Sequence, residues 1–223
     1  MSYFNNSNYN GSGFISNMTP VVRNLVIINV VVYLASQIIG EAAYEKFALY
    51  AFGSPLFRPW QIVTHMFMHG GFWHIFFNMY SLVIFGSVLE NIWGSRKFLL
   101  FYFVTGIGAA FCHNLVMHLQ IMGADGAIAM QLLHVPTVGA SGAIYGLLLG
   151  FGMLFPDAEL RLVFFPFFPL RAKWLVVIFG IIELLTGIGG ADNIAHFAHL
   201  GGMLFGLLLI LYWKKKNKLY DYN

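Results

Sequence analysis

The sequence contains few charged residues and only one cysteine. Asp, Glu, Lys and Arg make up 9% of its 223 residues, whereas hydrophobic residues make up 59%. Because soluble domains typically contain about 25% charged residues, this composition excludes an ordinary soluble protein and indicates a membrane protein. The single cysteine, Cys112, excludes an internal disulfide bond and a cysteine-based metal site. The net charge is only +3 and the basic residues lie near the ends of apolar segments, so no nucleic-acid partner is expected.

The apolar residues form six segments that are each long enough for a transmembrane helix, which needs about 20 residues. They predict an all-α polytopic membrane protein with one six-helix domain at residues 18–213. The expected spans are residues 21–39, 72–91, 98–122, 137–155, 172–188 and 194–213. Residues 1–17 are rich in Asn, Ser and Gly and predict a disordered cytoplasmic tail, and residues 214–223 predict a basic cytoplasmic tail.

The longer segments between these spans are interrupted by charged residues or prolines. Residues 40–71 mix charged and aromatic residues, a composition typical of a loop in the interfacial zone of a bilayer. Residues 123–135 predict a loop. Residues 156–170 contain three prolines, and they predict a broken connector on the surface rather than a helix.

The basic residues are distributed unequally between the two sides of the predicted bundle. Ten of the twelve Lys and Arg residues fall on one side, while Lys46 and Arg58 fall on the other. Because Lys and Arg are enriched in cytoplasmic loops, this asymmetry predicts that both termini lie in the cytoplasm. The size and architecture are typical of a protein of the bacterial inner membrane, and we expect that location.

The fourth predicted span begins near a serine and has glycines along one face. Gly142, Gly146 and Gly150 are four residues apart, and small residues on one face let neighbouring membrane helices approach closely. Ser141 lies at the start of this helix, where the backbone N–H groups have no intrahelical partners. Taken alone, the segment also fits a packing helix whose serine bonds to its own backbone.

The second, fourth and sixth predicted spans all run inward from the outer face, and each carries polar residues in its first turns. His74 and Asn78 belong to the second span, Ser141 to the fourth and His199 to the sixth, so all four are expected at similar depth. Polar groups inside a bilayer are costly and by default indicate function. A serine hydroxyl is activated when a neighbouring base takes its proton, and imidazole titrates in the right range. His199 is therefore the candidate base for Ser141.

Glycines beside Ser141 and His199 favour close approach of the two helices and of a substrate backbone. Gly202 lies three residues after His199 on the same helix face, so the sixth span can pack on the glycine face of the fourth. Gly139 and Gly142 lie on either side of Ser141 and permit close approach by a substrate backbone.

His74 and Asn78 are four residues apart and share one face of the second span. Both can donate hydrogen bonds, and together with the backbone N–H of Ser141 they would form an oxyanion hole. Each alone would also be explained by a hydrogen bond between helices, which contributes about 0.6–2 kcal/mol in membrane proteins.

Other histidines leave two alternatives open. His196 is the rival base, but it lacks the glycines in register, so His199 is favoured and His196 is assigned a supporting role. His65 and His69 are four residues apart and, with His74, suggest a metal site. No carboxylate or cysteine accompanies them, so no metal is expected, and no organic cofactor is expected either.

Two acidic residues belong to the predicted spans. Glu90 ends the second span beside the basic turn that contains Arg96 and Lys97, which predicts anchoring at the cytoplasmic end. Glu183 lies inside the fifth span, and the sequence assigns it no role.

Three motifs, in order along the chain, carry a family resemblance. They are His69-Gly-Gly-Phe-Trp-His74 with Asn78, Gly139-Ala-Ser-Gly142 with Tyr145, and Ala198-His-Leu-Gly-Gly202 with Gly206. With them, residues 58–206 resemble the rhomboid family of intramembrane serine proteases. Two other signatures of membrane proteases, His-Glu-x-x-His and Gly-x-Gly-Asp, are absent. One departure from the family is Gln61, because some relatives have arginine after the tryptophan that is Trp60 here.

The resemblance implies a rhomboid-like six-helix bundle with a Ser141–His199 dyad and no third, acidic member. It also implies that His74, Asn78 and Ser141 stabilise the oxyanion and that Tyr145 packs beside His199.

The function implied is hydrolysis of peptide bonds in the transmembrane segments of other membrane proteins, near the outer face of the lipid bilayer. Residues 40–71 would form the family's membrane-embedded first loop. Substrates would enter laterally, and segments whose helix is weakened by Gly or Ala would be favoured. The alternative is a proteolytically inactive relative that binds transmembrane helices. Such relatives usually lack the serine or the histidine, and this chain has both.

Overall fold

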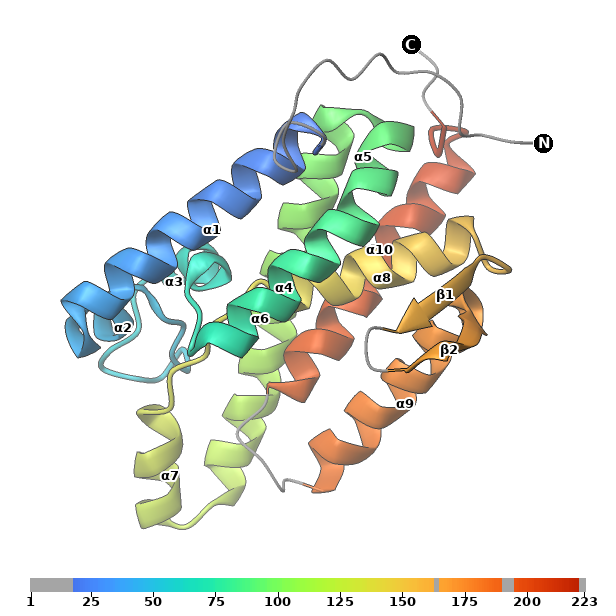
Figure 1. The fold of residues 1–223 in the computed structure, drawn as a ribbon. Coiled ribbons are helices and arrows are strands. Elements are labelled where there is room, and N and C mark those ends of the chain that lie inside the picture. Colours follow the sequence, from blue (N-terminus) through green and yellow to red (C-terminus); the bar gives the residue numbers. More distant parts are fainter. Residues whose placement is uncertain (1–17, 163–164, 190–194, 221–223) are drawn as a thin grey trace.

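The computed structural model describes residues 18–162, 165–189 and 195–220, and these residues form a bundle of helices (Figure 1). The predicted tail at residues 1–17 lies outside the described residues. Among the described residues, five helical segments are long and apolar enough to cross a membrane, and a shorter apolar helix accompanies them. They are α1 (Pro20–Ile39), the continuous segment α4–η3–α5 (Phe72–Ser81, Leu82–Gly86 and Ser87–Trp93), α6 (Ser95–Gly123), α9 (Ala172–Gly189), α10 (His196–Lys215) and the shorter α8 (Ser141–Leu154). The prediction of an all-α polytopic membrane protein is confirmed.

Helix α8 is the shortest of these and lies at the centre of the bundle, in contact with α4, α5, α6, α9 and α10 (Figure 1). Its glycine face is buried against two neighbours. A Cβ added at Gly202 of α10 would lie 1.8 Å from the carbonyl oxygen of Gly142, and one added at Gly146 would lie 2.6 Å from Thr105 of α6. The backbones of α8 and α10 therefore touch, as the spacing of their glycines predicts.

Helix α8 begins at Ser141, four residues later than the predicted start at residue 137. The preceding residues are extended because Thr137 exchanges backbone hydrogen bonds of 2.8 and 2.9 Å with Leu49. Gly139 then has φ +127°, which a helix does not allow and which L side chains rarely adopt. This turn sets Ser141 at the first position of the helix, inside the bundle.

The first loop, residues 40–71, contains the short elements α2 (Glu41–Phe47), α3 (Gln61–Thr64) and η2 (His65–Phe67). The Gln61 side chain is fully buried and braces this loop. Its Nε2 donates to the carbonyl oxygens of Glu45 (3.2 Å) and Leu56 (3.1 Å), and its Oε1 accepts a hydrogen bond of 3.0 Å from the backbone N–H of Arg58. The neutral amide thus holds three backbone groups at the position where some relatives have arginine.

Two connectors differ from the predictions. Residues 123–135, expected as a loop, contain α7 (Gly126–Leu133), whose N-terminus is capped by Asp125 Oδ1 at 2.9 Å from the backbone nitrogen of Ile128. The described residues of the segment 156–170 contain no helix, as predicted, and they pair as an antiparallel hairpin of β1 (Glu159–Leu162) and β2 (Phe165–Arg171).

Glu90 is anchored at the end of its span by two backbone groups and a hydroxyl. Its two carboxylate oxygens accept hydrogen bonds of 2.9 Å from the backbone N–H groups of Val21 and Val22, and Ser95 Oγ donates to it at 2.6 Å. The carboxylate therefore caps the N-terminus of α1, where unpaired N–H groups and the helix dipole favour a negative charge. The sequence predicts anchoring at this end of the span, and the structure shows that the partners are backbone N–H groups of α1 and the Ser95 hydroxyl.

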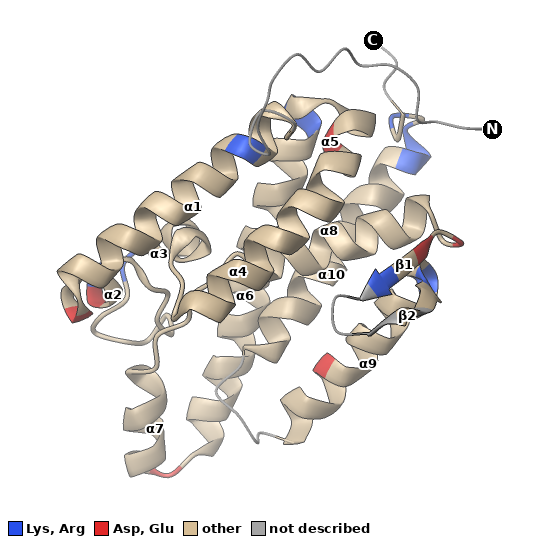
Figure 2. Cartoon of the chain, in the orientation of Figure 1, with Lys and Arg blue, Asp and Glu red and all other residues tan. Residues whose placement is uncertain are grey.

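Most Lys and Arg residues lie toward the end of the bundle where α1 begins and α10 ends, which includes the β1–β2 hairpin (Figure 2). At this end, Lys97 lies over the ring of Trp213, 4.6 Å from its centroid, and donates a hydrogen bond to the carbonyl oxygen of Lys218. The described part of the predicted basic tail is thus attached to the start of α6.

Candidate active site

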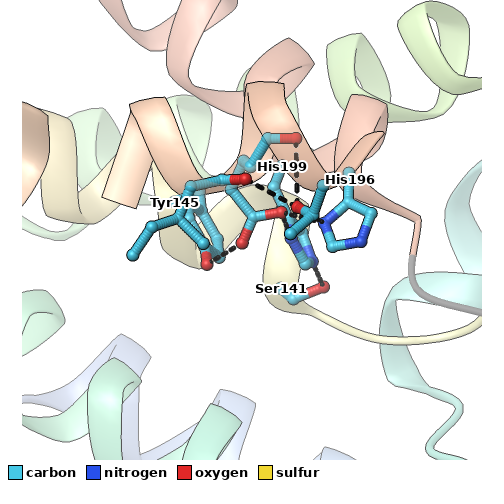
Figure 3. Close-up of polar contacts among 7 residues, drawn as sticks. Ser141, Tyr145, His196 and His199 are labelled. Carbon is cyan, nitrogen blue, oxygen red and sulfur yellow. Dashed lines mark hydrogen bonds and ion pairs between the residues drawn. The ribbon is translucent and has the colours of Figure 1, made fainter. Parts of the chain in front are cut away.

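The structure brings Ser141 and His199 together. Ser141 Oγ, at the start of α8, lies 2.8 Å from Nε2 of His199 on α10 (Figure 3). This distance is within the range in which a base can accept the proton of a nucleophile. The approach depends on the glycines described above, since His199 and Gly202 lie on the face of α10 that contacts Gly142.

Tyr145 lies one turn after Ser141 and stacks on the His199 ring. The two ring centroids are 4.3 Å apart and the ring planes differ by 5° (Figure 3). Such stacking restricts rotation of the imidazole, so that Nε2 stays directed toward Ser141. This is the packing that the family resemblance implies.

His74 and Asn78 of α4 lie near Ser141. The backbone N–H of Gly70 points to His74 Nδ1 over 3.4 Å, which leaves Nε2 as the nitrogen that bears the proton. This Nε2 is close to Gly139, since a Cβ added there would lie 2.7 Å from it and 3.5 Å from Ser141 Oγ. A side chain at residue 139 would therefore occupy the space between His74 and Ser141.

The Asn78 amide is buried and faces the same region. Its Nδ2 donates to the carbonyl oxygen of His74 at 2.7 Å, and its second amide hydrogen remains available for another acceptor. Asn78 and Ser141 both line a cavity of about 500 Å³. All four candidate side chains, His74, Asn78, Ser141 and His199, thus lie in one region, although the first two make no hydrogen bond to Ser141.

The 500 Å³ cavity is lined mainly by apolar side chains. They come from α4 and η3 on one side, from α8 at its base and from α9 on the other side, with two residues of β1. The lining residues are Phe77, Asn78, Tyr80, Ser81, Ile84, Phe85, Ser141, Ile144, Tyr145, Leu148, Leu160, Arg161, Leu175 and Phe179. The cavity is therefore largely apolar and reaches Ser141.

Glu183 of α9 is a site residue that sequence reasoning missed. Its carboxylate is buried, with 5% of the residue exposed, and it accepts a hydrogen bond from the Tyr145 hydroxyl. Its Oε2 lies 2.6 Å from His196 Nδ1 and 2.9 Å from His199 Nδ1. The resemblance implies a dyad with no acidic member, whereas the structure has a carboxylate beside His199. The available signal was a single carboxylate inside an apolar helix.

The structure places His196 away from the nucleophile. Its Nδ1 contacts Glu183 Oε2 and lies 3.1 Å from Thr186 Oγ1, while Ser141 Oγ bonds to His199. His196 therefore supports the carboxylate rather than competing with His199 for the serine.

Two groupings of histidines were possible metal sites. The His65 ring donates from Nδ1 to the carbonyl oxygen of Gln61 at 2.8 Å, and the fully buried His69 ring packs edge-on against His74 at 5.1 Å. Burial lowers the pKa of His65 to about 4 and that of His69 to about 3, so both are neutral at pH 7. The His65 ring braces the first loop through its bond to Gln61.

The other grouping is Glu183, His196 and His199. Among the described residues, these three offer ligand atoms that all lie within 4.8 Å of one another, which is close enough to hold a metal ion. In the structure, however, the carboxylate oxygens are engaged by Tyr145 and by the two imidazoles. The carboxylate is thus hydrogen-bonded to Tyr145 and His196 and lies against the His199 ring without a metal ion.

The fold and this arrangement define a multi-pass membrane protein with a partly buried serine–histidine pair. The family model described as "Rhomboid domain" matches residues 56–216, and the chain belongs to the rhomboid family. Similar curated proteins include "Putative rhomboid protease YdcA" of Bacillus subtilis (strain 168), 30% identical over 72% of this chain and 71% of that protein. The human "Presenilin-associated rhomboid-like protein, mitochondrial" is 30% identical over 69% of this chain and 39% of its own length.

The chain is also similar to "Rhomboid-like protein 19" of Arabidopsis thaliana, with 27% identity over 92% of this chain. The match spans 65% of that plant protein and 41% of "RHOMBOID-like protein 2" from the same plant. Several of these relatives are therefore longer than the region they share with this chain.

Proposed function

We propose that the protein is a serine endopeptidase that hydrolyses peptide bonds in the transmembrane segments of other membrane proteins. Ser141 would be the nucleophile and His199 its base. The observation that carries the proposal is the 2.8 Å distance between Ser141 Oγ and His199 Nε2 at the edge of an apolar cavity of about 500 Å³. Membership of the rhomboid family and the protease name of the Bacillus subtilis relative also support it.

In this reaction Ser141 Oγ attacks the carbonyl carbon of the scissile bond while His199 Nε2 takes the hydroxyl proton. His199 then gives this proton to the leaving amine, the C–N bond breaks, and the acyl group stays on Ser141 as an ester. A water molecule, deprotonated by His199, attacks the ester carbon. Oγ leaves and regains its proton from His199, which releases the carboxylic acid product.

The negative charge that develops on the carbonyl oxygen would be stabilised by three donors. These are His74 Nε2–H, the free amide hydrogen of Asn78 and the backbone N–H of Ser141. Helix α8 begins at Ser141, so that N–H has no intrahelical partner and is available to the oxyanion. Gly139 keeps the space between His74 and Ser141 open for the substrate backbone.

The partners would be membrane proteins whose transmembrane segments enter from the lipid bilayer. The cavity is lined from α4 and η3 on one side and from α9 on the other, which suits lateral entry of an apolar segment. Segments with a helix weakened by Gly or Ala would be cleaved preferentially, because attack requires an extended backbone. We propose that residues 18–213 form the catalytic domain, with a tail at 1–17 and a basic tail at 214–223.

The charge distribution supports an orientation with both termini in the cytoplasm and the site near the outer face (Figure 2). We further propose the bacterial inner membrane as the location, on the basis of size and architecture.

The test is labelling of the detergent-solubilised protein with a fluorophosphonate probe, together with cleavage of a transmembrane reporter protein. Wild type, Ser141→Ala and His199→Ala are compared. We expect labelling and cleavage by the wild type and loss of both in the two variants. Binding of the reporter by the wild type without labelling or cleavage would instead support an inactive relative that binds transmembrane helices.

A further inference from the structure

Glu183 is a carboxylate in the middle of an apolar helix, and the reaction described above does not use it. Placing such a group in a membrane helix is costly unless it is well paired. Its environment supplies that pairing from two neighbouring helices. Tyr145 of α8 donates to Oε1, and His196 and His199 of α10 approach Oε2.

The His199 ring lies between Ser141 and Glu183. Nε2 is 2.8 Å from Ser141 Oγ, and Nδ1, on the other side of the ring, is 2.9 Å from Glu183 Oε2. The buried Nδ1 makes no aligned hydrogen bond, so the contact with Glu183 is one of charge and proximity. Catalytic hydrogen bonds are often poorly aligned in the free enzyme and tighten when the transition state forms.

The chemistry of the two groups determines what this contact does. A neutral imidazole carries one proton, and an ionised carboxylate can only accept. A carboxylate beside Nδ1 therefore favours the tautomer with the proton on Nδ1, which leaves the Nε2 lone pair free for the Ser141 hydroxyl. When His199 takes the serine proton, the resulting imidazolium gains a negative partner at 2.9 Å.

The other contacts of Glu183 hold this partner in place. The Tyr145 hydroxyl fixes Oε1, and the hydrogen bond of 2.6 Å from His196 Nδ1 fixes Oε2. Tyr145 also stacks on the His199 ring, so one residue fixes both the imidazole and the carboxylate.

We propose that Glu183 is a positioning residue for catalysis, which selects the reactive tautomer of His199 and stabilises its protonated form. This inference rests on the proposed protease function. It adds an acidic member to a site for which the family resemblance implies only a serine and a histidine. A purely structural role, in which Glu183 only ties α9 to α8 and α10, predicts a different outcome on substitution.

The test measures kcat and KM for a transmembrane reporter, with the melting temperature of each variant in detergent. Removal of the acidic member of a serine protease triad lowers kcat by up to about 3 × 10⁴-fold. Because the Glu183 carboxylate is shared with His196 and is not aligned with Nδ1, we expect Glu183→Gln to lower kcat by about 10²-fold, with KM within about threefold of wild type. Glu183→Asp keeps the charge and should have an intermediate kcat.

Glu90→Gln is the matched control, since it neutralises another buried carboxylate of the bundle that is bonded to the start of α1. We expect it to lower the melting temperature and to leave kcat unchanged. A double variant adds a second criterion. If Glu183 acts through His199, Glu183→Gln should have no further effect on the residual rate of His199→Ala.

A wild-type kcat in folded Glu183→Gln, or equal losses of kcat in Glu183→Gln and Glu90→Gln, would overturn the positioning role alone. If Glu183→Gln does not fold, Glu183→Asp is tested instead, because its carboxylate is one methylene farther from Nδ1. A wild-type kcat in Glu183→Asp would then overturn the positioning role. A wild-type protein that neither reacts with fluorophosphonate nor cleaves the reporter would refute the proposed function and this inference together.

Discussion

Replacing Gly202 by alanine tests whether the contact between α8 and α10 builds the active site. The added Cβ would lie 1.8 Å from the carbonyl oxygen of Gly142 and 2.7 Å from its carbonyl carbon. Both are backbone atoms within α8, so neither can move aside by a change of rotamer. Relief requires the two helices to separate by about 1.5 Å, because ordinary contacts of a Cβ begin near 3.4 Å.

A separation of that size would break the hydrogen bond between Ser141 and His199, which is 2.8 Å long in the structure. A misplacement of about 1 Å at a catalytic centre can cost about 10²-fold in rate, so we expect Gly202→Ala to lower the rate of fluorophosphonate labelling by at least about 10²-fold. Overpacking of a tight core typically costs about 1–3 kcal/mol, and a clash with backbone belongs at the upper end of this range. The melting temperature in detergent should fall as well.

Two further glycines provide a graded comparison. A Cβ at Gly206 would lie 3.4 Å from Gly146 and 3.2 Å from Phe101, so Gly206→Ala should have a small effect. Gly126 in α7 has no atom within 4 Å of such a Cβ, and Gly126→Ala should leave labelling and melting unchanged. If Gly202→Ala labels at the wild-type rate and melts at the wild-type temperature, the reasoning from backbone contact is refuted.

Three other predictions follow from single residues. Asn78→Ala removes a proposed oxyanion donor and should lower kcat by about 10²–10³-fold with little change in KM, measured on a transmembrane reporter. A kcat within threefold of wild type would show that Asn78 does not contribute to the oxyanion hole. Glu90→Ala removes the acceptor of two backbone N–H groups of α1 and should destabilise the protein by about 1–3 kcal/mol, seen as a lower melting temperature with unchanged fluorophosphonate labelling; unchanged melting would contradict the capping role. For pH, burial lowers the pKa of His65 to about 4 in the folded protein, below its value of 6.5 in the unfolded chain, so the unfolded state binds more protons between these values. On going from pH 7 to pH 5, His65 should therefore lower the free energy of unfolding by about 2 kcal/mol. The melting temperature should fall more steeply with decreasing pH in the wild type than in His65→Asn, and equal slopes of melting temperature against pH would contradict this account.

The membrane spans could be predicted because a transmembrane helix is encoded locally. Apolar composition and length are sufficient to locate α1, α6 and α9 within a few residues. The start of α8 could not be located in this way, since residues 137–140 are small or apolar and carry no charge. What ends the helix there is the bridge from Thr137 to Leu49 and the positive φ of Gly139, and both depend on contacts with the first loop.

The short elements, α7 and the β1–β2 hairpin, could not be predicted for a related reason. The sequence Gly126–Leu133 is apolar and short, so neither length nor charge distinguishes a helix there from a loop. The helix is capped at its N-terminus by a single side chain, that of Asp125. In the hairpin, proline correctly excluded a helix, but the pairing of Glu159 with Arg171 joins residues twelve apart, and no local signal specifies that register.

The choice between the two histidines of α10 shows what could be read from helix geometry and what could not. His196 and His199 are three residues apart, so they differ by about 4.5 Å along the axis and by about 60° around it. Gly202 continues the His199 face, and this spacing alone favours His199 as the residue that meets α8. The carboxylate that both histidines contact belongs to α9, whose rotation relative to α10 is not encoded by any spacing within α10. Glu183 could therefore be recognised in the sequence as a costly buried charge, while its partners, and with them its role, became apparent only when the helices were packed together.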